Sequence, residues 1–95
     1  MAAASLRPRH GARFLLDLVA PADPSGAARY RATVVWPDRD EPLDLVVQPD
    51  GRADLAPDPA LPWAADVLRA LARTLASSAR ATAWPRRLNR WRAPR

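Results

Sequence analysis

The sequence contains no cysteine, no lysine and no isoleucine, and it has three glycines in 95 residues. Without cysteine no disulfide or thiolate metal site can form, so the core alone must hold the fold together. Three scattered glycines cannot build a phosphate-binding loop. No segment approaches the roughly 18 consecutive apolar residues of a membrane-spanning helix. These absences predict one small domain, which we expect to be cytoplasmic.

Groups suited to catalysis are equally scarce. The single histidine, His10, lies between Arg9 and Arg13 in a basic segment, where we expect it to be solvated. Four acids near the middle of the chain are interrupted by prolines and lack the turn glycine of a calcium-binding loop: Asp38, Asp40, Glu41 and Asp44. We therefore predict a protein that is not an enzyme and that uses no cofactor and no metal.

The positive charge is concentrated at the two ends of the chain. Residues 1–13 hold three arginines and residues 80–95 hold six, with no acid in either segment. The residues between them hold ten acids and six arginines, so the net charge of +5 combines basic ends with an acidic body. This asymmetry makes both ends candidate arms for binding an anionic partner.

Alternating apolar residues predict three strands, at residues 14–20, 29–36 and 43–48. The connecting segments PADPSGA and PDRDEP are rich in turn-forming residues, so the strands should form an antiparallel meander. In QPDGR, Gly51 suits the left-handed position of a bulged hairpin, and a short fourth strand is expected at residues 52–56. Four charged residues on the polar strand faces could pair across the sheet, and we expect them to belong to a solvated sheet face: Asp17, Arg29, Arg31 and Asp44.

The apolar period changes from two to that of a helix after Asp58. Asp58 and Pro59 suit the N-cap and first helical positions, so a helix should begin between residues 59 and 62. It should end near Ala83, because Pro85 disfavours helical dihedral angles at the residue before it. Its apolar side chains fall within an arc of about 140°: Trp63, Val67, Leu68, Leu71 and Leu75. Arg69, Arg73 and Arg80 lie on the opposite side.

The predicted fold is therefore α+β, with a three- or four-stranded antiparallel meander packed against one C-terminal amphipathic helix. Residues 1–13 form a basic N-terminal arm, residues 14–83 the domain, and residues 84–95 an Arg/Trp-rich C-terminal tail. One helix covers one face of such a sheet. The other face carries Leu15, Val19, Val35 and Val46, and this partly apolar face is a candidate assembly surface.

The C-terminal tail admits three interpretations. Residues 86–93, RRLNRWRA, have the spacing of one or two helical turns, with Leu88 and Trp91 on one side. The arginines can neutralise phosphates while Trp84 and Trp91 stack on bases. Alternatively, Leu88 and Trp91 anchor a protein partner whose acidic surface meets the arginines. In the third interpretation, Trp84 and Leu88 fold back over the core and the arginines pair with the acidic body.

We favour a protein-interaction module, either a small adaptor or a subunit of a larger assembly, that uses the apolar sheet face and the Arg/Trp tail. The partner would be another protein or a second copy of the chain. Nucleic-acid binding by the basic tail is the alternative, and a membrane surface is not favoured. The predicted partner-binding residues are Arg69, Arg73, Arg80, Trp84, Arg86, Arg87, Leu88, Arg90, Trp91 and Arg92.

Overall fold

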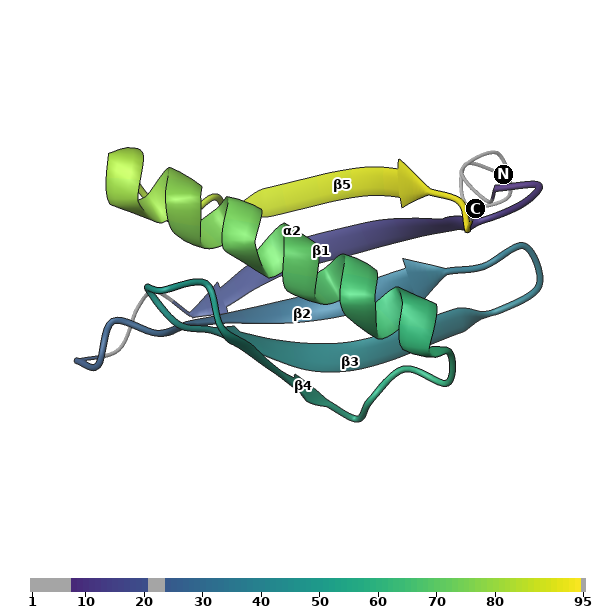
Figure 1. The fold of residues 1–95 in the computed structure, drawn as a ribbon, viewed down its shortest axis with the longest axis horizontal. Coiled ribbons are helices and arrows are strands. Elements are labelled where there is room, and N and C mark those ends of the chain that lie inside the picture. The colour runs from purple at the N-terminus through teal and green to yellow at the C-terminus, as the bar shows by residue number, and fades with distance from the viewer. Residues whose placement is uncertain (1–7, 21–23, 95) are drawn as a thin grey trace.

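The computed structural model describes residues 8–20 and 24–94. These residues form one antiparallel sheet in the order β4-β3-β2-β1-β5, and the helix α2 crosses one face of it diagonally (Figure 1). The elements in chain order are β1 (Ala12–Ala20), β2 (Ala28–Val35), β3 (Asp40–Val47), β4 (Ala53–Ala56), α2 (Pro62–Ala81) and β5 (Arg87–Arg92). Residues 1–7 of the predicted N-terminal arm, residues 21–23 and Arg95 lie outside the described residues.

The first four strands form the predicted meander. Each pairs antiparallel with the next, and their ends differ from the predicted ones by at most three residues. Alternate side chains are fully buried along β2 and over the first half of β1, as period-two patterning requires. Gly51 has φ +94°, and Gln48 and Arg52 are joined by a backbone hydrogen bond of 2.8 Å. The hairpin expected from QPDGR is therefore confirmed.

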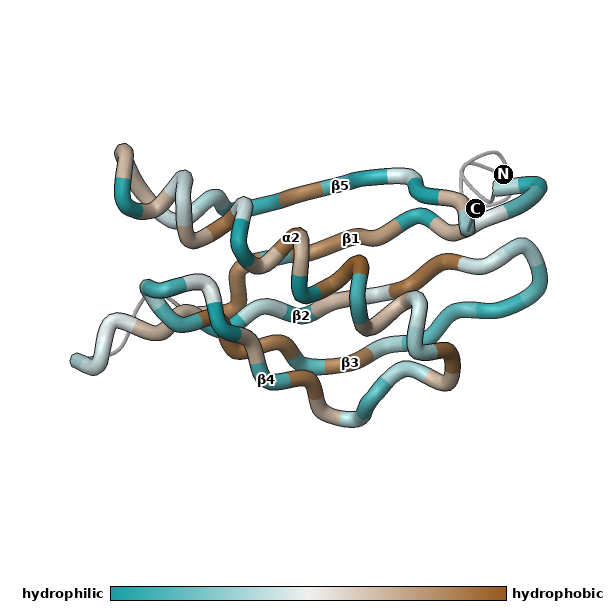
Figure 2. The backbone as a smooth tube through the Cα atoms, in the orientation of Figure 1, coloured by the Kyte–Doolittle hydropathy of each residue, from teal (hydrophilic) through white to brown (hydrophobic). Residues whose placement is uncertain are grey.

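The core lies between this sheet and one face of α2. Its largest fully buried side chains come from both layers: Tyr30, Phe14, Leu16, Leu45, Leu68, Leu75, Val34 and Val47. Figure 2 shows hydrophobic segments recurring along β1, β2 and β3, whereas β5 is hydrophilic over most of its length. Burying each large apolar side chain contributes roughly 1.5–3 kcal/mol, so the amphipathic pattern of α2 is sufficient to dock it on the sheet.

The start of α2 lies within the predicted range, but its N-cap differs from the predicted one. The helix begins at Pro62 after the N-cap residue Leu61, which makes no side-chain capping bond, so Asp58 is not the N-cap. The backbone N–H of Ala60 instead donates to Glu41 Oε2 at 3.1 Å. This bond holds the loop before α2 against strand β3, and the helix begins two residues later, at Pro62. The helix ends at Ala81, close to the predicted end. No helix among the described residues is long and apolar enough to cross a membrane.

The C-terminal tail is the main correction to the predicted fold. The sheet has five strands rather than three or four, because Arg87–Arg92 forms β5 and pairs antiparallel with β1. Residues 86–93 therefore do not form further helical turns, and much of the predicted tail belongs to the domain. A helix of one or two turns has little stability by itself. As a strand, the segment forms backbone hydrogen bonds with β1 and buries Leu88.

Candidate functional site

The pairing of β5 with β1 brings the two basic ends of the chain together. The register places Ala12 opposite Arg92, so residues 9–13 lie beside the end of β5. Gly11 has φ +69°, and a side chain there would contact the Arg92 carbonyl oxygen. The chain thus turns closely around the end of β5. We call the resulting surface the basic edge, comprising Arg9, His10, Arg13, Arg86, Arg87, Arg90, Trp91 and Arg92.

The two faces of β5 are different. Leu88, Arg90 and Arg92 share the face that α2 packs on, because their register partners Leu16, Phe14 and Ala12 are core residues. Leu88 is 8% exposed and belongs to the core, whereas Arg90 and Arg92 are exposed. Arg87, Asn89 and Trp91 lie on the opposite face, which no helix covers (Figure 1). We call this the open face.

Trp91 is held against the N-terminal segment. Its Nε1 donates to the His10 carbonyl oxygen at 3.1 Å, and the His10 ring stands edge-on to the indole at 5.3 Å. Arg13 is its direct partner across the strands, and Arg13 Nη1 donates to Asn89 Oδ1 at 3.4 Å. The indole is nevertheless 42% exposed. It therefore offers an aromatic surface beside Arg13 on the open face.

A row of alternating charge crosses the open face. Asp44, Arg31, Asp17 and Arg87 lie side by side on four neighbouring strands. Arg31 Nε is 3.1 Å from Asp44 Oδ1, and Arg87 Nε is 2.9 Å from Asp17 Oδ1. Pairing of Arg31 with Asp44 is as expected, whereas Asp17 takes its partner from β5. Such exposed ion pairs contribute little to the stability of the fold, so their main effect is to neutralise the charge on this part of the open face.

This row also divides the apolar residues predicted for the open face. Val46 lies on one side of the row, with Leu15 and Val35 on the other. These three side chains are half-buried, and Val19, at 58% exposure, is the one of the four that is strongly exposed. The open face is consequently a mixed surface rather than a continuous apolar strip.

Three arginines of the basic edge differ from Arg87 in their partners. No carboxylate in the described part of the chain forms an ion pair with Arg86, Arg90 or Arg92. Two of them bond to main-chain carbonyl oxygens instead: Arg90 Nη1 to Asn89 at 2.9 Å and Arg92 Nη1 to Trp91 at 2.8 Å. Their charge is therefore available to an anionic partner.

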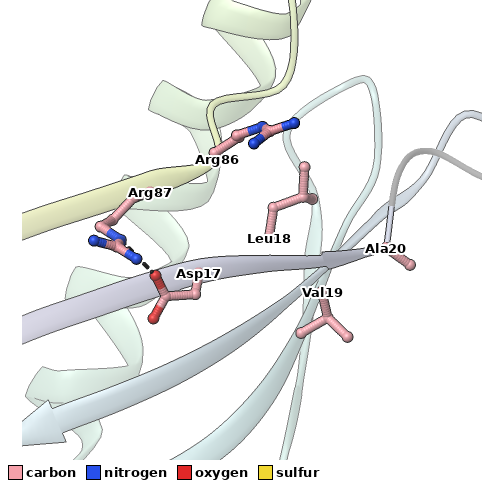
Figure 3. Close-up of a pocket in the computed structure, with 6 residues that line it drawn as sticks. All are labelled: Asp17, Leu18, Val19, Ala20, Arg86 and Arg87. Carbon is pink, nitrogen blue, oxygen red and sulfur yellow. Dashed lines mark hydrogen bonds and ion pairs between the residues drawn. The ribbon is translucent and has the colours of Figure 1, made fainter.

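A shallow groove marks the start of the basic edge. The groove has a volume of about 700 Å³ and is lined by Asp17, Leu18, Val19, Ala20, Arg86 and Arg87. The N–H of Leu18 donates to the Arg86 carbonyl oxygen at 2.8 Å, and β1 then runs on beyond the start of β5. In Figure 3, Arg87 turns toward Asp17 while Arg86 points away from it. In the groove, the guanidinium of Arg87 is therefore neutralised by Asp17, whereas that of Arg86 remains available to a partner.

The ten predicted partner-binding residues are separated into three groups. Arg86, Arg87, Arg90, Trp91 and Arg92 lie on the basic edge. Trp84 packs against the core, 6.5 Å from the Tyr30 ring, and Leu88 is buried, so both support the fold. The three arginines of α2 lie on the side of the helix that faces the β3–β4 hairpin.

Those helix arginines lie around the β3–β4 hairpin. Arg69 and Arg73 line a groove there with Asp50 and Asp54, and Arg80 Nη1 donates to the Pro49 carbonyl oxygen at 2.5 Å. They do not continue the basic edge. Sequence reasoning missed the contribution of Asn89 and the direct pairing of Arg13 with the tail. Neither had a local signal, because the apolar residues of RLNRWR are three apart rather than at alternate positions.

The connection between α2 and β5 is fixed by a buried phenol. Tyr30 is fully buried, and its hydroxyl donates to the Pro85 carbonyl oxygen at 2.5 Å. Burial raises the pKa of Tyr30 to about 12, because the phenolate would lose solvation. Tyr30 therefore remains neutral and positions the residues that lead into β5.

Comparisons with protein-family models, curated proteins and solved structures found no match for this chain. Within the described residues, no group of three or more His, Cys, Asp or Glu side chains is arranged to hold a metal ion. The functional argument therefore depends on the basic edge itself.

Proposed function

We propose that this chain is a non-enzymatic protein-interaction module, an adaptor or assembly subunit, that binds an acidic protein partner at its basic edge. The observation that carries the proposal is the convergence of both basic ends on one strand. Arg86, Arg90 and Arg92 present charge there that the described acids leave unneutralised. Trp and Arg are the residue types most enriched at energetically important interface positions, and β5 displays both.

The distribution of charge favours a protein over a polynucleotide. A phosphate backbone lying across the open face would meet Asp17 and Asp44, whose charge alternates with that of the arginines. A peptide confined to β5 meets the arginines and avoids that row. Because the charged row divides the apolar residues of the open face, we assign the proposed contact to the basic edge rather than to that face.

Nucleic-acid binding is the second candidate, and the exposed indole of Trp91 favours it. A single strand following β5 would place phosphates on the arginines and one base on Trp91. Among the described residues, Trp91 is the one Phe, Tyr or Trp side chain on the open face, since the others belong to the core or pack against it. Stacking would therefore be limited to a single base, and affinity would depend mainly on phosphate contacts.

The test compares two labelled ligands, an acidic peptide of alternating glutamate and threonine and a single-stranded oligonucleotide. Each is titrated against the full chain and against Arg86→Gln/Arg90→Gln/Arg92→Gln. The control variant, Arg29→Gln/Arg69→Gln/Arg73→Gln, removes the same charge from exposed positions elsewhere. We expect the edge variant to bind the peptide about tenfold more weakly, because it loses three exposed ion pairs with the peptide. The control variant should bind the peptide at most about twofold more weakly.

Two results would contradict the proposed function. If both triple variants weaken peptide binding equally, net charge rather than the basic edge is responsible. If the oligonucleotide binds with a steep salt dependence that the edge variant removes, while the peptide does not bind, the nucleic-acid alternative is correct.

A further inference from the structure

The backbone of β5 has one side that faces away from the sheet. The hydrogen bond from Leu18 N–H to the Arg86 carbonyl identifies the residues of β5 that bond to β1. In an antiparallel pair such residues alternate, so Leu88, Arg90 and Arg92 follow Arg86 toward β1. The N–H and C=O groups of Arg87, Asn89 and Trp91 therefore point outward. An outward row of this kind can accept another strand.

Two of these outward carbonyls are already occupied by arginine side chains. Arg90 donates to the Asn89 oxygen and Arg92 to the Trp91 oxygen, each from the residue that follows the carbonyl. A neutral strand approaching β5 would have to displace both guanidinium groups and would offer them no anionic acceptor in exchange. An acidic strand would offer carboxylates in exchange. The arginines thus make the edge selective for negatively charged segments.

We propose that the basic edge receives an extended acidic segment of the protein partner as an additional antiparallel strand, whose carboxylates draw Arg90 and Arg92 away from the Asn89 and Trp91 carbonyls. This inference rests on the proposed function and specifies its partner. Carboxylates at alternate positions of the segment would face Arg90 and Arg92, which lie on the same face of β5. Arg87 contributes less, because Asp17 already holds it.

A second copy of β5 does not fit this edge. Two such strands would bring arginines from both copies together at one interface, and like charges on paired strands are destabilising. The opposite edge of the sheet is a poorer receptor, since β4 has four residues against the six of β5. Charge complementarity therefore selects an acidic segment at β5.

The experiment uses N-methylated versions of the glutamate–threonine peptide. In antiparallel addition, the residues opposite Arg87, Asn89 and Trp91 direct their N–H groups toward β5. When the glutamates face Arg90 and Arg92, these residues are the threonines. One peptide is methylated at its threonine nitrogens, and the matched control is methylated at its glutamate nitrogens, which face solvent.

We expect the threonine-methylated peptide to bind the full chain about tenfold more weakly than the glutamate-methylated one, because it cannot donate to the Asn89 and Trp91 carbonyls. Equal affinity of the two methylated peptides would overturn strand addition and leave an acidic partner at the edge intact. Failure of every acidic peptide to bind would overturn the inference and the proposed function together.

A variant that lacks Arg90 and Arg92 tests whether these arginines make the basic edge selective for acidic segments. With the full chain, replacing glutamate by glutamine in the peptide should abolish measurable binding. With Arg90→Gln/Arg92→Gln the two peptides should bind with similar affinity, whereas the control Arg69→Gln/Arg73→Gln should discriminate as the parent does. Retained discrimination in Arg90→Gln/Arg92→Gln would overturn the role assigned to these two arginines.

Discussion

At the residue scale, the single tyrosine of the chain connects the core to the basic edge. The ring of Tyr30 lies within the sheet–helix core, while its hydroxyl reaches the Pro85 carbonyl two residues before β5 begins. The path of the chain from α2 to β5 therefore depends on a group that must stay protonated to donate this bond.

The raised pKa of Tyr30 predicts a loss of stability at high pH. The unfolded chain should ionise near its ordinary value of 10.0, whereas the folded protein ionises at about 12. The stabilisation is fully present below pH 10 and falls as the pH rises toward about 12, because only the unfolded state loses a proton in that interval. Tyrosinate absorbance should report these two values in native and urea-unfolded protein. Ionisation of the native protein near pH 10 would show that the hydroxyl is solvated.

At the scale of elements, β5 combines a structural face and a binding face within six residues. Leu88 points into the core and Trp91 stands exposed on the open face, so substitutions of these residues should separate the two functions.

Leu88→Ala should lower the free energy of unfolding by about 2–4 kcal/mol, since it removes a buried side chain and leaves a cavity. Trp91→Ala should lower it by less than about 1 kcal/mol, because the indole is partly exposed, yet it should weaken binding of the acidic peptide. Denaturant unfolding and peptide titration of both variants test this. A small stability loss in Leu88→Ala would indicate that β5 is only loosely attached to β1.

The same element shows how far the sequence could predict the structure. Strong alternation located β1, β2 and β3, and the period of α2 located its buried face. Residues 86–93 carried only a helical signal, because Leu88 and Trp91 are three residues apart and RLNRWR does not alternate between apolar and polar residues. As a strand, the segment consequently places these two side chains on opposite faces. The segment forms a strand because it pairs with the free edge of β1, which is distant in sequence. Charge counting identified both basic ends, but their contact follows from the β1–β5 pairing and had no local signal.

At the scale of the whole molecule, the charge is separated between the basic edge and an acidic remainder. Arginines of both chain ends lie together, whereas most acids of the described residues lie on the β2–β3 and β3–β4 connections and on β3. An approaching acidic ligand is therefore attracted to one edge over distances comparable with the screening length, about 10 Å at 0.1 M salt.

This separation predicts that salt acts mainly on the rate of association. Raising the ionic strength from about 0.02 to about 0.5 M should slow association of the acidic peptide by about tenfold, because steering is screened, while dissociation changes little. Stopped-flow mixing of labelled peptide with the full chain measures both rates. An unchanged association rate with faster dissociation would mean that short-range contacts, not steering, dominate.

The β1–β5 pairing also determines the order in which the sheet is completed. It joins the first and last strands of the chain, and its Arg87–Asp17 contact spans 70 residues in sequence. Contacts this distant form late in folding, since a long loop must close before they stabilise the structure. Until then β1 presents its backbone and the apolar side chains beside Leu16 to other chains. A truncation before Arg87 would leave β1 as an exposed edge strand of the sheet, and we expect such a protein to be prone to aggregate.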